Sequence, residues 1–286
     1  MRYDFRFVKY HGCGNDFIIK DELGGDLTPD RYRGKLAAVL CDRHFQIGAD
    51  GILFLESSKG VDGSMRLFEP DGKEADMCGN GIRCVGAYLC DKLDKNAVDV
   101  LTRDGVKHIL RIGNQYRVDM GTVRTRRSDL RQYFADKGRP DDSLLDITID
   151  AAGRKIPCAL VNSGEPHLVA WSKSVEKEDV VGIGDALKRQ RSRFPRGVNV
   201  NFVEPTGTHK IKVRTYERGV YYETLACGTG ATASAAVALI KSWVKPGPVK
   251  VQVRGGEMSI ELDASGKAVM LGPAVRVFAG QMTVDV

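Results

Sequence analysis

Short stretches in which apolar and polar residues alternate recur through most of the chain, and this spacing is typical of half-buried β-strands. In the first half the alternation predicts strands over residues 5–10, 17–20, 51–56, 64–68, 97–102, 108–112 and 116–120. In the second half it predicts strands over residues 155–161, 167–172, 200–203, 210–216, 249–254, 257–262, 268–272 and 274–278. Helical patterns of small and apolar residues predict two helices, over 80–92 and 229–242.

The two predicted helices begin with the same turn, and the two halves of the chain repeat one another. EADMCGNGIRCVGAYLC at 74–90 and ETLACGTGATASAAVAL at 223–239 both run Glu, three residues, then Cys-Gly-x-Gly. Cys78 and Cys227 are 149 residues apart (227 − 78 = 149), and 149 residues also separate Gly48 from Gly197. We therefore predict an internal duplication. It gives an α+β fold of two pseudo-symmetric domains, each a mostly antiparallel sheet around a central helix.

The boundary between the domains is expected in the polar, poorly periodic segment near 121–148. We place the N-terminal half at residues 1–130 and the C-terminal half at residues 131–273. For the end of the chain, residues 274–286, a return to the N-terminal half stays open.

Composition argues against several classes of partner. The formal net charge of +6 comes from 43 basic and 37 acidic residues spread along the chain, which does not indicate a nucleic-acid partner. No stretch approaches the ~20 apolar residues of a membrane span, and the first residues include no apolar signal region. We therefore expect a cytoplasmic protein without a membrane partner. The seven cysteines form no CxxC pairs, which argues for reduced thiols and against a metal site or a disulfide framework.

The two matched cysteines, Cys78 and Cys227, each precede a predicted helix in a Gly-rich turn. Unpaired backbone N–H groups and the positive end of the helix dipole favour a thiolate there and also bind anions. Pseudo-symmetry is expected to bring both sulfurs to one small-molecule site. One thiolate can then remove an α-proton while the other thiol protonates the opposite face. The residues therefore predict an amino-acid racemase or epimerase that needs no cofactor.

Other interpretations of the cysteines stay open. Cys78 and Cys227 could be buried and inert, or could form a disulfide in an oxidised, inactive state. A silent amino-acid-binding protein or a thiol redox sensor would be a relative of another functional class. The cysteines without a match in the other half are assigned to the core or the surface: Cys13, Cys41, Cys84, Cys90 and Cys158.

Six motifs, in order along the chain, resemble the diaminopimelate epimerase family. They are KYHGCGNDFI at 9–18, DRHFQIGADG at 42–51, ADMCGNGIRC at 75–84, GVNVNFVE at 197–204, YERG at 216–219 and ETLACGTGATA at 223–233. The resemblance implies a pyridoxal-free interconversion of L,L- and meso-2,6-diaminopimelate, a step toward lysine and peptidoglycan precursors. It also implies a cytoplasmic enzyme, commonly a homodimer, that acts on a small amino acid.

The resemblance also implies roles for individual residues. Cys78 and Cys227 would be the catalytic bases, with His167 and Glu217 as polar supports beside them. The reacting end of the substrate would be bound by Asn15, Gly79, Asn80, Gly228 and Thr229. The distal carboxylate would be bound by Asn199 and Arg218, with Glu217 adjacent, and arginine suits such a two-pronged contact.

The sequence departs from the family pattern at the implied distal pocket. Glu69 and Glu165 stand where the family usually has asparagine, so both are possible specificity positions. The loop from Glu217 to Cys227 is one residue longer than the commonest family form and contains Tyr221 and Tyr222. An alternative function is therefore a racemase of a basic amino acid, such as histidine, lysine or arginine, with the same two-thiol mechanism.

Overall fold

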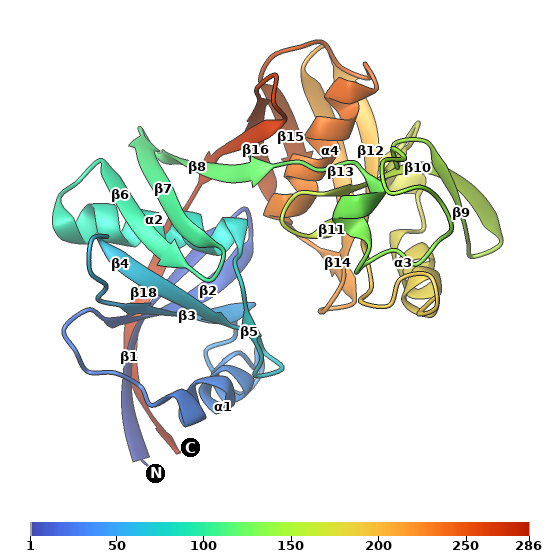
Figure 1. Ribbon diagram of the computed structural model, residues 1–286. Helices are drawn as coiled ribbons and strands as arrows, with labels where there is room; N and C mark the ends of the chain where they lie inside the picture. Colours follow the sequence, from blue (N-terminus) through green and yellow to red (C-terminus); the bar gives the residue numbers. More distant parts are fainter. Residues whose placement is uncertain (1, 286) are drawn as a thin grey trace. The chain divides into compact units, whose positions relative to one another are not determined.

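The computed structural model describes residues 2–285, with side chains described from Asp4 onward, and its contacts divide the chain into two compact units. The first unit comprises Met1–Asp119 with Leu271–Val286, and the second comprises Met120–Met270 (Figure 1). The predicted halves end instead at residues 130 and 273, and that division into domains remains a prediction.

The first unit is a sheet with two helices. Its strands are β1 (Arg2–Gly12), β2 (Asn15–Glu22), β3 (Gly51–Glu56), β4 (Gly63–Phe68), β5 (Glu74–Ala75), β6 (Ala97–Thr102), β7 (Gly105–Ile112), β8 (Gln115–Thr122) and β18 (Val275–Asp285). The helices are α1 (Asp30–Leu40) and α2 (Gly79–Leu93). The strands pair in the order β18-β1-β2-β3-β4-β6-β7-β8, and β5 pairs with β4. The β2–β3 and β4–β6 pairs are parallel and the others are antiparallel.

The second unit repeats this plan. Its strands are β9 (Ile147–Ala151), β10 (Arg154–Asn162), β11 (Pro166–Trp171), β12 (Asn199–Gly207), β13 (Lys210–Glu217), β14 (Tyr222–Thr224), β15 (Val249–Val253), β16 (Gly256–Leu262) and β17 (Lys267–Pro273). The helices are α3 (Val180–Lys188) and α4 (Gly228–Ile240), with short 3-10 turns at Arg127–Leu130 and Val175–Lys177. The pairing order is β9-β10-β11-β12-β13-β15-β16, and β14 pairs with β13.

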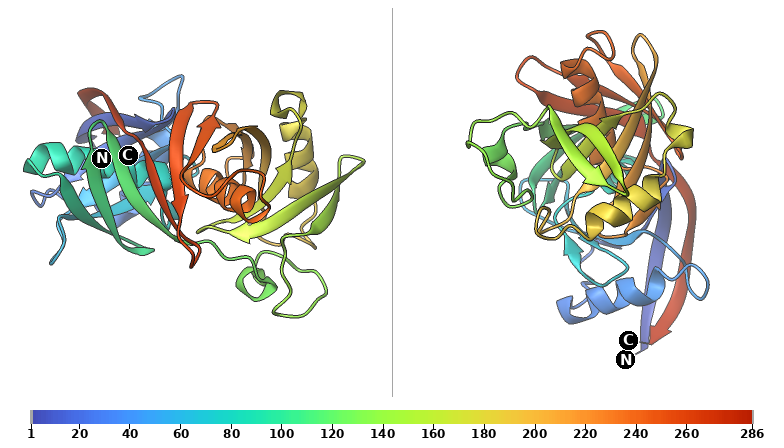
Figure 2. Two further views of the ribbon diagram at one scale, coloured as in Figure 1. Left: turned by 90° about the horizontal axis from the view of Figure 1, so that it is seen from above. Right: turned by 90° about the vertical axis from the view of Figure 1, so that its right-hand side faces the viewer.

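The two pairing orders match strand by strand, including the parallel pairs, β2–β3 with β11–β12 and β4–β6 with β13–β15. In the first unit β18 pairs with β1 as β9 pairs with β10 in the second, so the end of the chain completes the first sheet. Figures 1 and 2 show the two ends of the chain side by side on this ribbon. The matched glycines Gly48 and Gly197 even share a left-handed φ, of 71° and 74°. The predicted duplication and α+β class are confirmed.

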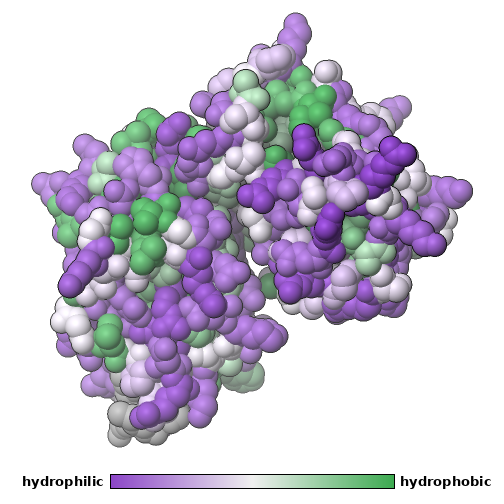
Figure 3. Space-filling view, in the orientation of Figure 1, coloured by the Kyte–Doolittle hydropathy of each residue, from purple (hydrophilic) through white to green (hydrophobic). Residues whose placement is uncertain are grey.

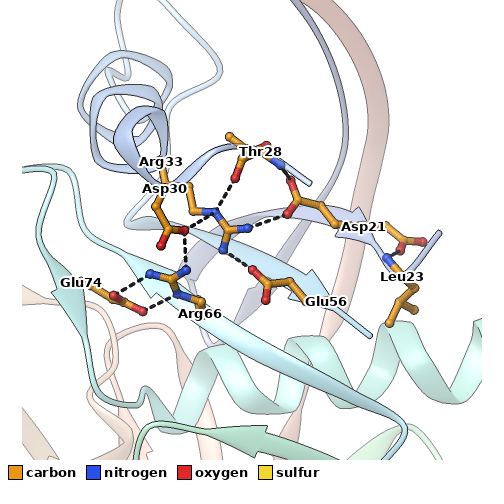
Figure 4. A network of polar contacts seen from close by, with 9 residues as sticks. Asp21, Leu23, Thr28, Asp30, Arg33, Glu56, Arg66 and Glu74 are labelled. Atoms are coloured by element: carbon orange, nitrogen blue, oxygen red, sulfur yellow. Dashed lines mark hydrogen bonds and ion pairs between the residues drawn. The ribbon is translucent and has the colours of Figure 1, made fainter. Parts of the chain in front are cut away.

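Side-chain contacts repeat as well. Arg66 on β4 forms two hydrogen bonds to Glu74 on β5, of 2.7 and 2.9 Å (Figure 4). Arg214 on β13 forms the equivalent bonds to Glu223 on β14, of 2.6 and 2.7 Å. Paired Arg–carboxylate bonds of this kind are directional, so each pair orients the short strand that leads into the following helix.

The two predicted helices are the central ones. In α4 almost every side chain is small and buried, which suits a helix enclosed on all sides, and α4 packs against β10 to β13, β15 and β16. In the same way α2 packs against most strands of the first unit. The sequence pattern did not predict α1 and α3. Arg33 of α1 is buried and donates to Glu22 at 3.0 Å, which attaches the helix to β2. Arg33 also contacts Glu56 of β3 (Figure 4).

Figure 3 draws one face of the chain, coloured by hydropathy. On the face drawn in Figure 3, hydrophilic side chains cover most of the surface and apolar side chains form only small patches. Within residues 2–285 no helix is both long and apolar enough to cross a membrane.

Candidate functional site

In the first unit Cys78 is the N-cap residue of α2. Its backbone is extended, with φ −135° and ψ 122°, and its Sγ accepts a hydrogen bond from the Gly81 N–H at 3.5 Å. Gly79 and Asn80 follow in the first turn and are buried, whereas Cys78 is half-buried. The sulfur therefore lies where unpaired N–H groups and the helix dipole favour negative charge, as the sequence predicted.

Asn15, at the start of β2, connects this turn to the sheet. Its Oδ1 accepts hydrogen bonds from Asn80 Nδ2 at 2.9 Å and from the Cys78 thiol at 3.7 Å. Its Nδ2 donates to Asp50 Oδ2 at 2.7 Å. The structure thus brings together Asn15, Cys78 and Asn80, three residues singled out from the sequence. It adds Asp50, which the sequence analysis missed.

Asp50 itself lies in a charged cluster. Its carboxylate also accepts from the Asp16 N–H at 3.1 Å and from Arg43 at 2.6 Å. Arg43 reaches Asp16 as well, at 2.6 Å, and Lys9 lies 2.6 Å from the other Asp16 oxygen. Burial, together with the neighbouring Asp16 charge, raises the pKa of Asp50. The cluster holds the Asp50 carboxylate in place behind Asn15.

Arg83 is a buried cation one turn into α2. Its side chain is completely buried, and its Nη2 donates to Asn80 Oδ1 at 2.8 Å. Burial lowers the pKa of Arg83, while the neighbouring thiols of Cys13, Cys84 and Cys78 act in the opposite direction. The guanidinium therefore fixes the Asn80 amide and adds positive potential near Cys78.

In the second unit Cys227 is the N-cap residue of α4, with the same extended backbone, φ −119° and ψ 114°. Its Sγ accepts from the Gly230 N–H at 3.3 Å and lies 3.4 Å from the Thr229 hydroxyl. Ser163 holds the turn by donating to the Thr229 carbonyl at 2.8 Å. Cys227 and Gly228 are buried. The predicted residues of this turn therefore lie together around the sulfur.

His167 lies behind this turn. It is completely buried, and its Nδ1 is 3.1 Å from Asn201 Nδ2, whereas its Nε2 has no hydrogen-bond partner among residues 2–285. Burial, and then the charge of Arg218, lowers the pKa of His167 to about 3, so the imidazole is neutral. A Cβ on Gly230 would lie 2.6 Å from Asn201 Oδ1, so Asn201 connects His167 to the first turn of α4. The sequence analysis missed Asn201.

Arg218 and Glu165 form an ion pair in the second unit. Arg218 Nε donates to Glu165 Oε2 at 2.5 Å, and Nη2 contacts the same oxygen. Nη1 donates to the Arg196 carbonyl at 3.0 Å, and the guanidinium lies 5.5 Å from the Tyr133 ring. Asn199 Oδ1 accepts from the Arg218 backbone N–H at 2.9 Å. Three groups therefore hold the guanidinium that the resemblance assigns to a distal carboxylate, and Asn199 holds the backbone of the same residue.

The other polar residues singled out from the sequence lie in the loop before Cys227 and in turns of the two units. Glu217 accepts a hydrogen bond from the Thr224 hydroxyl across the loop that leads to Cys227. Tyr221 in this loop has a left-handed φ of 57°, and its ring lies 3.8 Å from Lys188 Nζ. Glu69 is half-buried in the turn after β4 and belongs to the first unit, whereas Glu165 belongs to the second.

The five unmatched cysteines are buried, in line with their assignment to the core. Burial raises the pKa of every one of them, to about 12 for Cys41 and Cys158. Within residues 2–285 no disulfide joins any of the seven cysteines. Within residues 2–285 no group of three or more His, Cys, Asp or Glu side chains is arranged to hold a metal ion.

Comparison with known proteins identifies the family. The family model described as diaminopimelate epimerase matches residues 7–126 and 159–277, two segments that include both cysteine turns. The chain belongs to the diaminopimelate epimerase family. A diaminopimelate epimerase of Methanothrix thermoacetophila is 42% identical over 286 residues, covering 98% of this chain and 96% of its own length. One of Methanocella arvoryzae is 37% identical over 282 residues, covering 98% and 97%.

Solved structures share the fold at low identity. A hydroxyproline epimerase of Agrobacterium vitis has a TM-score of 0.72 at 14% identity, over 100% of this chain and 95% of its own. A probable proline racemase of Agrobacterium radiobacter has a TM-score of 0.70 at 14% identity, over 98% and 93%. The predicted membership of the diaminopimelate epimerase family is thus confirmed, whereas the roles of individual residues remain predictions.

Proposed function

We propose that the chain is an isomerase that interconverts L,L- and meso-2,6-diaminopimelate by moving the α-proton between Cys78 and Cys227. The observation that carries the proposal is the repeated position of the two thiols. Each is the N-cap of the central helix of its unit, and each accepts an N–H from the first turn. Membership of the diaminopimelate epimerase family supports the substrate.

The mechanism requires one base and one acid at the same α-carbon. One cysteine, as thiolate, removes the α-proton, and the other, as thiol, delivers its proton to the opposite face. The first becomes a thiol and the second a thiolate, so the next turnover can run in reverse. The α-carboxylate, which takes up the developing negative charge, would be bound by the N–H groups of the helix starts. The mechanism therefore requires both sulfurs to reach opposite faces of one α-carbon.

The residues around each thiol would orient it and the substrate. Asn15 and Asn80 would hold the reacting end beside Cys78, and Thr229 would do so beside Cys227. His167 is neutral and buried, so we assign it a supporting role through its free Nε2 rather than that of a charged acid.

We further propose that the enzyme uses no cofactor, acts in the cytoplasm and assembles as a homodimer, and that its product feeds lysine and peptidoglycan precursor synthesis. Family membership supports these statements. Light scattering of the purified chain would test the dimer, because a mass near the chain's own 31.4 kDa would contradict it.

Proton NMR in D2O tests the reaction directly. The α-proton signal of meso-diaminopimelate should disappear in the presence of the reduced protein, and Cys78→Ala and Cys227→Ala should each abolish this loss. Cys158→Ala is the matched control, because it removes a buried thiol of the second unit that the mechanism does not use. Loss of the signal in either active-site variant at the wild-type rate would contradict the two-thiol mechanism.

The Glu165–Arg218 ion pair favours one second candidate, a racemase of a basic amino acid. A carboxylate already on Arg218 opposes binding of a second carboxylate and would attract a cationic side chain. L-Lys, L-His and L-Arg should be assayed for the same α-proton exchange. Exchange with one of these but not with diaminopimelate would favour the second candidate.

The double variant Glu69→Asn with Glu165→Asn separates the candidates further. Both partners of the Glu165–Arg218 pair are partly exposed, so the pair is worth at most about 1 kcal/mol and its loss should change diaminopimelate turnover less than about fivefold. A gain far larger than this would indicate that the two glutamates exclude diaminopimelate in the native chain.

A further inference from the structure

The Asn15 side chain is shared between a carboxylate and a thiol. On one side Nδ2 donates to Asp50 Oδ2 at 2.7 Å. On the other side Oδ1 accepts from Asn80 Nδ2 at 2.9 Å and from the Cys78 thiol at 3.7 Å. An amide can rotate by half a turn, which exchanges its oxygen and nitrogen. The partners of Asn15 therefore decide which of its two ends faces Cys78.

Asp50 makes one of these orientations strongly preferred. An ionised carboxylate is an acceptor only, so an oxygen of Asn15 turned toward it would meet a second oxygen at hydrogen-bond distance. Asp50 cannot easily turn away, because it also accepts from the Asp16 N–H at 3.1 Å and from Arg43 at 2.6 Å. The carbonyl end of Asn15 is thus directed toward Cys78.

A carbonyl oxygen beside a cysteine sulfur changes the ionisation of the thiol. It accepts a proton from the thiol but repels the thiolate, so it favours the protonated form. The charged groups around this contact are Arg83 of α2, Asp16 of β2, Lys9 of β1 and Arg43 of the loop before β3. At Cys227 one neighbouring side chain is that of Thr229, whose hydroxyl can donate to a thiolate as well as accept from a thiol.

We propose that Asp50 is a positioning residue that, by orienting Asn15, keeps Cys78 more protonated and so available as the proton donor. The inference rests on the proposed function for the use of Cys78 in catalysis. The orientation and its effect on the thiol belong to the first unit alone and can be measured without any substrate.

Two substitutions separate orientation from charge. Asp50→Asn removes the negative charge but leaves an oxygen that can accept from both Asn15 Nδ2 and the Asp16 N–H. Asp50→Ala removes the charge and also the acceptor, so one of the two contacts that orient the Asn15 amide is lost. The contact with Asn80, which Arg83 holds, is then the one that still opposes turning the Asn15 nitrogen toward Cys78. Asp50→Leu, which keeps the volume without an acceptor, replaces Asp50→Ala if the latter lacks the wild-type circular dichroism spectrum.

The experiment measures iodoacetamide alkylation of each cysteine in the reduced, full-length chain across pH. Trypsin places Cys78 in the peptide 74–83 and Cys227 in the peptide 219–241, each as the single cysteine, so mass spectrometry follows both in one sample. The midpoint pH of each profile reports ionisation independently of access. We expect Asp50→Ala to lower the Cys78 midpoint by about half to one pH unit, equivalent to about three- to tenfold faster alkylation below the midpoint.

Asp50→Asn should keep the Cys78 midpoint close to wild type, and the Cys227 midpoint should stay unchanged in both variants. Equal shifts in the two variants would overturn the proposal, because the effect would then come from charge alone. An unshifted Cys78 midpoint in Asp50→Ala, or an equal shift at Cys227, would also overturn it. Failure of the proposed function would appear instead as absent α-proton exchange in the wild-type chain, with the Cys78 shift intact.

Discussion

The buried imidazole of His167 predicts a loss of stability in acid with a defined size. Burial, together with the charge of Arg218, lowers its pKa from the ordinary value of 6.5 to about 3 in the folded chain. Between these values the unfolded chain binds a proton that the folded chain does not. The contribution to stability is therefore complete above about pH 6.5 and is lost progressively as the pH falls toward 3.

The size follows from the two pKa values. Between pH 7 and pH 5 the linkage amounts to about 2 kcal/mol of lost unfolding free energy from this one group. Urea unfolding followed by tryptophan fluorescence measures the unfolding free energy of the second unit. Both tryptophans, Trp171 and Trp243, lie in that unit together with His167. The comparison uses wild type and His167→Gln at both pH values.

Carboxylates elsewhere also contribute to the acid response, but they contribute equally to wild type and to His167→Gln. The difference between the two pH-induced losses therefore isolates His167, and we expect wild type to lose about 2 kcal/mol more than the variant. Equal losses in both proteins would refute the conclusion that His167 is neutral in the folded chain, whatever the variant's stability at pH 7.

Two further predictions compare matched positions. Arg214→Met should lower the free energy of unfolding by about 2–3 kcal/mol, because the almost fully buried Glu223 carboxylate loses its paired bonds to Arg214. Urea unfolding measures this loss. Arg66→Met, at the more exposed equivalent pair, should lower the free energy of unfolding by less, about 1 kcal/mol. Urea unfolding followed by circular dichroism measures this loss. Gly230→Ala should slow α-proton exchange at least tenfold and destabilise the second unit, because its Cβ would lie 2.6 Å from Asn201 Oδ1 and 3.2 Å from the Cys227 sulfur.

Each of these comparisons has its own control. Gly24→Ala adds a Cβ with no atom within 4 Å, so it should leave exchange and stability unchanged. Wild-type exchange by Gly230→Ala would show that the first turn of α4 tolerates displacement and that its geometry does not matter. Equal costs for Arg66→Met and Arg214→Met would show that burial does not distinguish the two pairs.

The duplication could be predicted from the sequence because its signals are local. Alternating polarity marks each strand, and a constant spacing of 149 residues relates Cys78 to Cys227. Both residues are helix N-caps in the structure, with the N–H contacts that a Gly-rich turn before a helix predicts. The residues immediately following them, which the resemblance singled out, lie in the same turns.

The peripheral helices could not be predicted in this way. The segment of α3, VVGIGDALK, contains β-branched residues and two glycines, which locally favour a strand or a turn. Its helix depends on packing, since a Cβ on Gly184 would lie 2.2 Å from the Tyr216 ring on β13. In α1 the charged Arg33 is buried only because Glu22 pairs with it. Such contacts join residues distant in the sequence and leave no periodic signal.

The same limit applies to the site. Asp50 contacts Asn15, which is 35 residues away along the chain and accepts from the Cys78 thiol, and Asn201 meets His167 at a separation of 34. Neither residue has a distinctive local motif. Their roles become visible only when the hydrogen bonds are known.

A duplicated scaffold does not make the two thiols chemically equal. Asp50 and Asn199 occupy equivalent places, 149 residues apart (199 − 50 = 149), at the start of the fourth strand of each pairing order. Asp50 directly precedes β3, and Asn199 is the first residue of β12. The carboxylate of Asp50 orients Asn15 toward a thiol, whereas the amide of Asn199 accepts from the backbone of Arg218. A two-base epimerase needs matched positions for its sulfurs but opposite protonation states at any moment. Duplication supplies the matched positions, and divergence of the residues behind them can bias which sulfur holds the proton.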